Sequence, residues 1–197
     1  FLIRIDMLSN KNSWWAFESV LSKKFCNEVI EYGNQQKHLS GAVGKTKGNV
    51  DLRIRNSQVA WLNDPWIYKE IIPFIKLANK NAQWNYSFSG QENMQFTKYS
   101  DNQYYEWHKD EWDEKNKSND VRKLSVTCAL NEGDEYEGGN LEFQYRDYEN
   151  IQNEVCRFTR KQGSIIVFPS YVYHRVTPVL SGTRYSLVIW TLGEPWK

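Results

Sequence analysis

Two histidines and one aspartate in the second half of the chain can bind a metal ion together. They are His108, Asp110 and His174. In an extended segment, residues i and i+2 point to the same side, so His108 and Asp110 can bind one ion. Two neutral imidazoles and one carboxylate form the facial triad that suits non-haem Fe(II) and leaves three coordination positions open. A chelating co-substrate and dioxygen can occupy those positions, so the set is typical of an iron-dependent oxygenase.

A basic residue, Arg184, follows His174 by ten positions, at the start of a strand-like run. That spacing leaves room for a strand, a turn and the beginning of the next strand. A buried cation needs a partner, and a guanidinium can pair bidentately with a carboxylate. We therefore expect Arg184 to bind the distal carboxylate of a dicarboxylic acid that chelates the metal.

Helical signals dominate before about residue 90. Ser22 is a helix N-cap residue, and the apolar residues after it recur at three- and four-residue spacing as far as Ile30. Asp64 followed by Pro65 is a second start signal, and Pro73 is expected to bend the helix that follows rather than end it. The predicted apolar side of that helix consists of Ile67, Ile71, Phe74, Ile75 and Ala78.

After residue 90 the sequence changes to short β-rich runs separated by Gly, Asn, Asp and Pro. Several such strands are typical of a sandwich or barrel, and helices followed by strands favour helices on one face. We predict a single, mainly β domain over residues 1–197, with N-terminal helices (1–90) packed on one face of a double-stranded β-helix (jelly-roll, cupin-like) barrel at 91–197. The expected strands are Met94–Tyr99, Arg122–Leu130, Leu141–Tyr145, Val155–Arg160, Ser164–Phe168, His174–Pro178 and Arg184–Thr191.

Composition argues against several classes of protein. The formal net charge is +1 and no basic, aromatic-rich stripe is visible, which disfavours a nucleic-acid partner. The longest apolar runs fall far short of the roughly 20 residues that cross a bilayer, so we expect no membrane partner. Three cysteines without CxxC spacing indicate neither a disulfide framework nor a zinc site. We expect buried free thiols and a cytoplasmic protein.

Two polar segments, residues 41–48 and 111–120, are expected to be loops. The first is rich in glycine and lysine. The second follows the His108–Asp110 pair directly, and it is either a solvated loop or a lid that closes over the metal.

Three residues near the metal motifs are candidate substrate contacts, namely Trp107, Trp112 and Arg175. Trp107 could equally pack in the core, and Arg175 could pair with a surface carboxylate. Arg53 and Arg55 have the same two interpretations, and for Arg53 we favour the surface ion pair.

From about residue 14 to the C-terminus, the sequence resembles the prolyl 4-hydroxylase-like branch of the 2-oxoglutarate/Fe(II) oxygenases. Among these, the bacterial and phage PKHD-type hydroxylases are the most similar. The matching stretches are the Tyr99…Tyr105…His108-Lys-Asp110 run, Arg122–Val126, Leu130-Asn131, Gly138–Phe143, Gly163–Ser170, His174–Val179 and Gly182–Trp190.

The resemblance implies a double-stranded β-helix with the catalytic metal inside its mouth. It implies Fe(II), 2-oxoglutarate and dioxygen as cofactor and co-substrates, ascorbate as reductant, and succinate and CO2 as products. The substrate would be an amino-acid side chain in a protein, a peptide or a free amino acid, with prolyl 4-hydroxylation the reaction most often associated with the family. The metal ligands would be His108, Asp110 and His174, and the co-substrate pocket would contain Arg184, Tyr99, Thr127 and Ser186.

Other functions use the same kind of metal site. A cupin-type barrel could bind or isomerise a small molecule without 2-oxoglutarate, and a tetrahedral zinc site could hydrolyse its substrate. Arg184 and Tyr99 discriminate between these and the oxygenase, because only a 2-oxoglutarate pocket needs them. A third possibility keeps the co-substrate and replaces the amino acid by a nucleobase, which the near-neutral charge disfavours.

Overall fold

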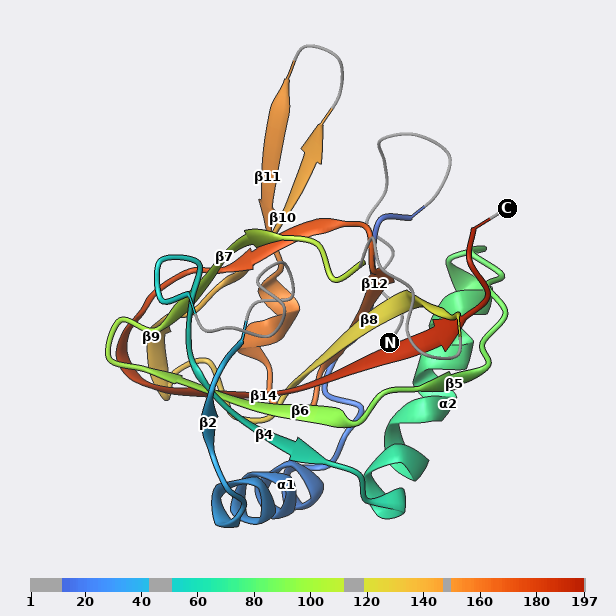
Figure 1. Cartoon of the computed structure of the whole chain (residues 1–197). Coiled ribbons are helices and arrows are strands. Elements are labelled where there is room, and N and C mark those ends of the chain that lie inside the picture. Colours follow the sequence, from blue (N-terminus) through green and yellow to red (C-terminus); the bar gives the residue numbers. More distant parts are fainter. Residues whose placement is uncertain (1–11, 43–50, 112–118, 147–149, 197) are drawn as a thin grey trace.

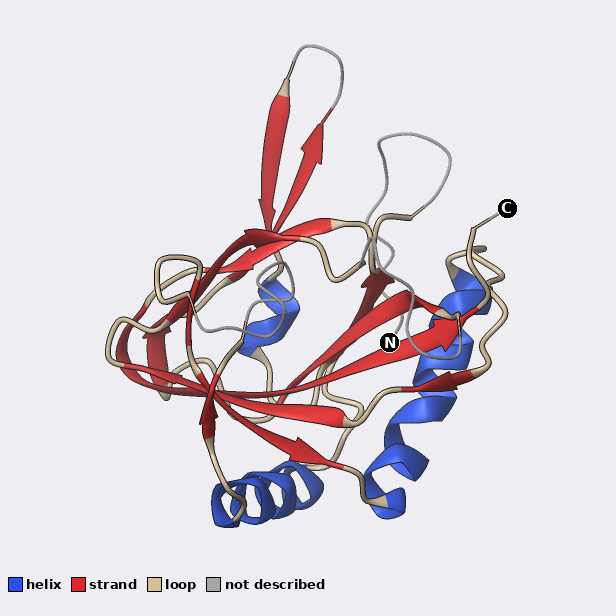
Figure 2. Cartoon of the chain, viewed as in Figure 1, coloured by secondary structure: helices blue, strands red, loops and turns tan. Residues whose placement is uncertain are grey.

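The computed structural model describes residues 12–42, 51–111, 119–146 and 150–196. Within these ranges the chain forms two antiparallel sheets and two α-helices (Figures 1 and 2). One sheet has nine strands and the other has five. This mainly β architecture is consistent with the predicted jelly roll.

The nine-stranded sheet is organised around its longest strand, β14 (Val179–Gly193), which pairs with β8 (Val121–Ala129) and β6 (Met94–Ser100). From β8 the sheet continues through β12 to β1, and from β6 it continues through β4 to β2. Two short strands, β5 and β9, also pair with β14. The remaining bounds are β1 (Trp15–Phe17), β2 (Leu39–Ser40), β4 (Gln58–Leu62), β5 (Gly90–Gln91), β9 (Tyr136–Gly138) and β12 (Ile165–Pro169).

The five-stranded sheet has the order β11-β10-β13-β7-β3. In its centre β13 pairs with β7 so that His174 lies opposite His108. At its edge β3 pairs with β7 so that Arg55 lies opposite Tyr105. The strands are β3 (Arg55–Asn56), β7 (Tyr104–His108), β10 (Leu141–Arg146), β11 (Ile151–Val155) and β13 (Tyr173–Val176).

Both predicted helices are present. α1 (Lys23–Gln35) begins after Ser22, whose Oγ accepts a hydrogen bond from the amide of Phe25 at 3.1 Å. α2 (Pro65–Asn81) begins after Asp64, although the Asp64 side chain makes no capping hydrogen bond. The fixed φ of proline at the first helical position thus helps to start α2 without a side-chain cap.

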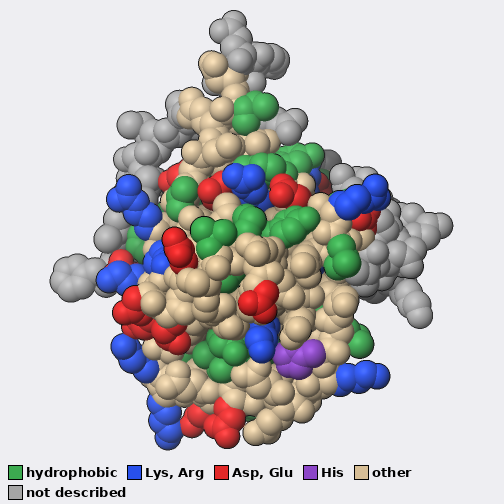
Figure 3. Space-filling view, turned by 90° about the vertical axis from the view of Figure 1, so that its left-hand side faces the viewer, with side chains coloured by type: hydrophobic (Ala, Val, Ile, Leu, Met, Phe, Trp, Pro, Cys, Tyr) green, Lys and Arg blue, Asp and Glu red, His purple; other side chains and the backbone are tan. Residues whose placement is uncertain are grey.

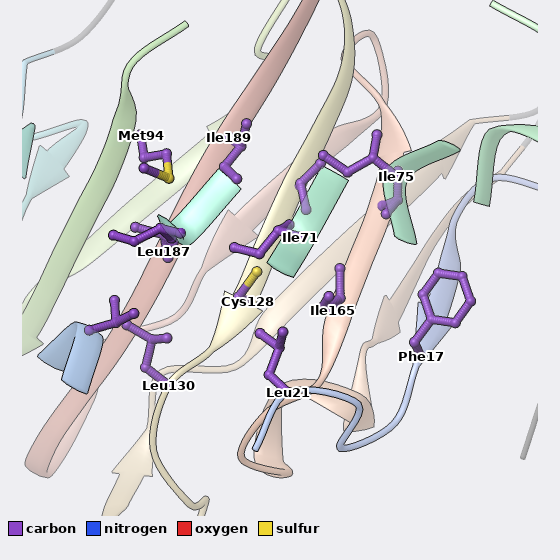
Figure 4. Packing of buried hydrophobic residues seen from close by; sticks show 14 of the residues in the cluster. Phe17, Leu21, Ile71, Ile75, Met94, Cys128, Leu130, Ile165, Leu187 and Ile189 are labelled. Atoms are coloured by element: carbon purple, nitrogen blue, oxygen red, sulfur yellow. The ribbon is translucent and has the colours of Figure 1, made fainter. Parts of the chain in front are cut away.

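The main hydrophobic core lies between the helices and one face of the nine-stranded sheet (Figure 4). Ile71 and Ile75 of α2 belong to the same buried cluster as Leu187 and Ile189 of β14. α2 continues past Pro73, as predicted. Four of its five predicted apolar residues are buried, and the fifth, a phenylalanine, is partly buried against the cluster.

The first 90 residues contribute strands as well as helices, which the sequence analysis did not predict. β1, β2, β3 and β4 have five residues or fewer, too few for a periodic pattern to be distinctive. The predicted strand Val155–Arg160 is wrong, because β11 ends at Val155 and Arg157–Arg160 form a 3-10 helix. There Thr159 donates its hydroxyl to the carbonyl of Cys156 at 2.9 Å, a local bond that favours a turn over a strand.

The three cysteines are free and buried, as predicted. The predicted loops at 41–48 and 111–120 lie largely outside the described residues, and so does the question of a lid. Within the described ranges, no helix is both long enough and apolar enough to cross a membrane. The cellular compartment stays a prediction.

Candidate active site

The structure brings the three predicted metal ligands together between β7 and β13. The ligand atoms of His108, Asp110 and His174 all lie within 4.8 Å of one another, and all three residues are buried. One carboxylate oxygen of Asp110 is 3.7 Å from Nε2 of His108, and the other is 3.5 Å from Nε2 of His174. A cross-strand pair of histidines and an i, i+2 carboxylate therefore converge on one point.

Backbone carbonyls orient both imidazoles. Nδ1 of His108 lies 2.7 Å from the carbonyl oxygen of Glu106, and Nδ1 of His174 lies 2.9 Å from that of Val172. A carbonyl oxygen only accepts hydrogen bonds, so each Nδ1 carries a proton and donates it. In the neutral ring the Nε2 lone pair is then free for a metal ion, which is the usual arrangement of metal-binding histidines.

Burial sets the charges of the site. It lowers the pKa of His108 well below its usual value, and the neighbouring His174 lowers that pKa further. For Asp110, burial acts to raise the pKa, but the neighbouring His174, His108 and Arg122 together outweigh it and lower the pKa to about 2. A neutral His108 and an ionised Asp110 can both bind a cation without first losing a proton.

Residues distant in the sequence hold the backbone of Asp110. Its amide donates to the carbonyl of Ser170 at 3.0 Å, and its carbonyl accepts from Nη1 of Arg122 at 3.4 Å. Arg122 in turn makes two hydrogen bonds to Glu92, at 2.7 and 2.6 Å, and its guanidinium lies 3.9 Å from the centre of the Trp190 ring. These contacts keep the carboxylate opposite the two histidines.

The triad lies in a cavity of about 1330 Å³ between the two sheets. Its lining includes Tyr105 and Val176 from the smaller sheet, and Thr127 and Arg184 from the larger sheet. Ligand pockets commonly measure roughly 300–1,000 Å³, so this cavity has room for a co-substrate and a substrate together. The outer face of the protein that Figure 3 shows has basic and acidic side chains interspersed.

Arg184 lies in the same cavity, 2% exposed, opposite Tyr99 in the register of β14 and β6. Its Nη1 donates to Oγ of Ser186 at 3.1 Å, and its guanidinium carbon is 5.6 Å from the centre of the Tyr99 ring. Its Nε is buried, and no residue in the described ranges accepts a hydrogen bond from it. A buried cation with an unused donor is suited to an anion that enters the cavity.

The paired glycines at 138 and 139 make room for this arginine. Both have positive φ, +73° and +59°, which glycine adopts at little cost. A Cβ on Gly139 would lie 3.0 Å from Cδ of Arg184 and 2.9 Å from Cγ2 of Val179. Glycine at position 139 therefore leaves the space in which the Arg184 side chain lies.

Comparison with known proteins distinguishes among the functions that this geometry allows. The family model described as the 2OG-Fe(II) oxygenase superfamily matches residues 94–192, a span that includes the triad and Arg184. The chain belongs to this superfamily. Relatives with the names of PKHD-type and prolyl 4-hydroxylases are among the proteins to which it is similar.

Among the relatives, a PKHD-type hydroxylase of Synechococcus sp. (strain CC9605) is 40% identical over 86 residues, which are 44% of this chain and 35% of that protein. The chain thus spans about a third of this relative's length. A PKHD-type hydroxylase of Prochlorococcus marinus (strain MIT 9215) is 25% identical over 176 residues, 87% of this chain and 71% of that one.

Solved structures share the fold. The crystal structure of a Pseudomonas putida prolyl-4-hydroxylase has a TM-score of 0.67 at 19% identity, and the match covers 93% of this chain and 94% of that one. A viral collagen prolyl hydroxylase from Paramecium Bursaria Chlorella virus-1, in complex with 2OG, has a TM-score of 0.63 at 18% identity over 92% and 97% of the two chains.

The described residues of this oxygenase fit the groups that the superfamily name implies. Two Nε2 atoms and a carboxylate are the donor set of non-haem Fe(II) sites, and Arg184 offers an unused N–H to a dicarboxylic acid. Tyr99, Thr127 and Ser186 line the same cavity, as expected for residues that alternate along a strand with core residues. Their contact with 2-oxoglutarate stays a prediction.

The predicted substrate residues of the oxygenase lie in different surroundings. Trp107 borders the cavity. Arg175 lies 4.7 Å over the Trp107 ring and pairs with Glu142 at 2.8 Å, and it is not among the cavity-lining residues. The structure thus shows the ion pair that the sequence left open for Arg175. Trp112 lies outside the described residues, and a substrate role for any of these residues stays a prediction.

Three cavity residues of the oxygenase, Glu92, Arg122 and Trp190, were not predicted as site residues. Trp190 had a usable signal, because it lies an even number of positions from Arg184 on the same strand and so points to the same side. Glu92 and Arg122 come from segments that meet only in the folded protein. The hint available for Arg122 was a basic residue at the start of the predicted strand Arg122–Leu130.

Proposed function

We propose that this chain is an Fe(II)- and 2-oxoglutarate-dependent dioxygenase that hydroxylates an amino-acid side chain, in the manner of the prolyl 4-hydroxylases. The observation that carries this proposal is one cavity that contains both a triad with free Nε2 lone pairs and a buried arginine with an unused N–H. The names of the relatives support it. One structural neighbour, from Trichoplax adhaerens, is a prolyl hydroxylase in complex with a peptide fragment of hypoxia inducible factor.

In this proposal His108, Asp110 and His174 hold Fe(II), and Arg184 pairs with the distal carboxylate of 2-oxoglutarate. When bound, iron and 2-oxoglutarate supply the oxidation, in which dioxygen and 2-oxoglutarate become succinate and CO2 while a substrate C–H becomes C–OH. The chain binds and orients these molecules and keeps water away from the reacting atoms. Ascorbate would keep the iron ferrous.

A turnover assay tests the proposal. Purified protein supplied with Fe(II), ascorbate and 2-oxoglutarate should release succinate, slowly without substrate and faster with a suitable one. The substrate panel would contain proline- and lysine-containing peptides, free amino acids and nucleotides. His108→Ala should abolish both metal binding and turnover. Stoichiometric zinc in the active protein, with no effect of 2-oxoglutarate, would contradict the proposal in favour of a zinc site.

The role of Arg184 is tested separately. Arg184→Ala should raise the half-saturating concentration of 2-oxoglutarate roughly 10- to 100-fold, because a charge-assisted, bidentate hydrogen bond is lost. Iron affinity should change by less than about twofold, since the histidines and Asp110 are untouched. The exposed Arg157, changed to alanine, is the matched control. An equal loss of iron and 2-oxoglutarate affinity would argue against a co-substrate role for Arg184.

A further inference from the structure

Four arginines line the cavity, and they differ in their partners. Arg53 and Arg122 each pair with a nearby carboxylate, at 2.9 and 2.6 Å. Within the described part of the chain, Arg184 and Arg55 have no such carboxylate. The proposed function gives Arg184 the distal carboxylate of 2-oxoglutarate as its partner. Arg55 is left as a second buried cation without an anion.

Among the residues that the structure describes, the immediate contacts of Arg55 are all neutral. The residue is 5% exposed, its Nε donates to Oγ of Ser57 at 2.8 Å, and its Nη1 donates to the carbonyl of Ala42 at 3.2 Å. Its Nη2 is buried and has no hydrogen-bond partner among the described residues. Burying a guanidinium with neutral acceptors and an idle donor is costly. The arrangement becomes favourable when an anion binds to the unused side of the guanidinium.

The chain is shaped to hold Arg55 in this position. A Cβ on Gly41 would lie 2.3 Å from Oγ of Ser57 and 2.5 Å from Nε of Arg55, so only glycine fits here without a shift. The amide of Gly41 donates to the carbonyl of Ser57 at 2.8 Å. Gly41 therefore leaves space for the Arg55 side chain, and Ser57 holds it by a hydrogen bond.

Arg55 and Arg184 have similar surroundings. Each lies opposite a tyrosine in the neighbouring strand, Tyr105 for Arg55 and Tyr99 for Arg184. The guanidinium carbons lie 4.5 and 5.6 Å from the centres of those rings. A tyrosine phenol is uncharged near neutral pH, so Tyr105 supplies no counter-ion to Arg55. The chemistry that suits Arg184 to a carboxylate applies equally to Arg55.

Arg55 is also close to the metal ligands. The Tyr105 ring stacks on the His108 imidazole, with centres 3.5 Å apart and planes at 13°. The guanidinium carbon of Arg55 therefore lies at most about 8 Å from the centre of that imidazole. A carboxylate bound there lies within the length of one small molecule from the metal site.

We propose that Arg55 binds a carboxylate of the substrate, so that the enzyme hydroxylates a small carboxylic acid of the free amino-acid type. This inference rests on the proposed function, because it takes the triad as the place of reaction. An internal residue of a peptide brings neutral carbonyls to Arg55 and leaves the buried charge without a counter-ion. A free α-carboxylate can accept hydrogen bonds from both Nη1 and Nη2.

The first test changes the substrate. Succinate release by the wild-type protein is measured with L-proline and L-prolinamide, with L-lysine and L-lysinamide, and with tripeptides of the same residues blocked at both ends. The acid of an accepted pair should stimulate release at a concentration roughly tenfold or more below that of its amide. Stimulation by a blocked peptide that equals or exceeds that of every free acid would overturn the proposal.

The second test changes the protein. Arg55→Gln should raise the half-saturating concentration of the accepted acid roughly 10- to 100-fold, and Arg55→Lys, which keeps the charge without the fork, should have a smaller effect. The change in the acid requirement should exceed any change in the 2-oxoglutarate requirement by roughly fivefold or more, and circular dichroism shows that the variants fold. Arg53→Gln is the matched control, since Arg53 is exposed and already paired with Asp51. Unchanged acid dependence in Arg55→Gln would contradict the assignment.

Calorimetric titration of the same acids into wild-type, Arg55→Gln and Arg53→Gln protein separates this inference from the proposed function. Absence of succinate under every condition would refute the oxygenase proposal, while acid binding that weakens only in Arg55→Gln would still support the carboxylate site. Equal acid binding by all three proteins, or no binding to the wild type, would overturn it.

Discussion

On β14, residues that follow one another in the sequence belong to two different environments. One face of the nine-stranded sheet packs against the helices and the other faces the cavity, and β6 and β8 alternate in the same way. The core face contains Phe96, Cys128, Leu187 and Ile189, whereas the cavity face contains Tyr99, Thr127, Arg184, Ser186 and Trp190.

The two faces satisfy different physical requirements. On the core face the side chains are apolar and fully buried, and volume and shape decide what fits. On the cavity face buried polar groups remain incompletely hydrogen-bonded, as Nε of Arg184 shows. Such groups lower stability and are kept where function needs them. We therefore predict that the side chains on one face of β14 stabilise the fold and that those on the other face bind ligands.

A pair of neighbouring substitutions on β14 tests this division most strongly. Leu187→Ala should lower the free energy of unfolding by about 2–5 kcal/mol, because it leaves a cavity in a fully packed core. Val188→Ala, one residue away on the cavity face, should lower it by less than about 1 kcal/mol, because its side chain already borders open space. Urea unfolding curves measure both values.

The same two variants should behave in the opposite way in the turnover assay. Folded Leu187→Ala should keep the half-saturating concentration of 2-oxoglutarate of the wild type. Val188→Ala, which alters the cavity wall, should change that concentration. Equal destabilisation by the two substitutions would show that the cavity wall is packed as tightly as the core, and the distinction between the faces would fail.

The core face also predicts a dependence of stability on pH. Burial raises the pKa of the Cys26 thiol to about 11, from 9.0 when unperturbed, and it also raises the pKa of the Cys128 thiol. Above pH 9 the unfolded thiol loses its proton and the folded thiol keeps it, so each pH unit between 9 and 11 should cost about 1 kcal/mol of stability per thiol.

Urea unfolding at pH 8, 9 and 10 measures this slope. Cys26→Ala removes one titrating group, so its free energy of unfolding should fall less steeply with pH than that of the wild type. The slopes are compared rather than the absolute values, because alanine also removes volume. Identical slopes would show that the Cys26 thiol does not contribute.

The parts of the site that the sequence predicted are those with regular local geometry. His108 and Asp110 are two residues apart in an extended segment, and Arg184 lies on a strand whose alternation can be read directly. Ser22 likewise marks the beginning of α1, because an N-cap acts within one helical turn. In each case the spacing along the chain determines the direction of the side chain.

The parts that the sequence could not predict depend on contacts between distant segments. The pair of Arg122 and Glu92 spans 30 positions, and the indole N–H of Trp196 donates to Glu111, beside the metal motif, at 2.7 Å. The short strand with Arg55 shows no period of its own, and its burial arises from pairing with β7. Nothing in the local sequence encodes such pairings, so the unused N–H groups on Nη2 of Arg55 can be recognised only in the folded protein.

The smallest expected effect concerns the stability cost of the cavity face itself. Arg184→Met keeps an unbranched side chain of similar length and removes a buried charge with an unused N–H. The ligand-free variant should therefore be more stable than the wild type by about 1 kcal/mol in urea unfolding. Addition of Mn(II) and 2-oxoglutarate should stabilise the wild type and leave the variant nearly unchanged, since a ligand stabilises only the state that binds it. A loss of stability as large as that expected for Leu187→Ala would mean that Arg184 is a structural residue, and the two faces of the sheet would then follow the same rule.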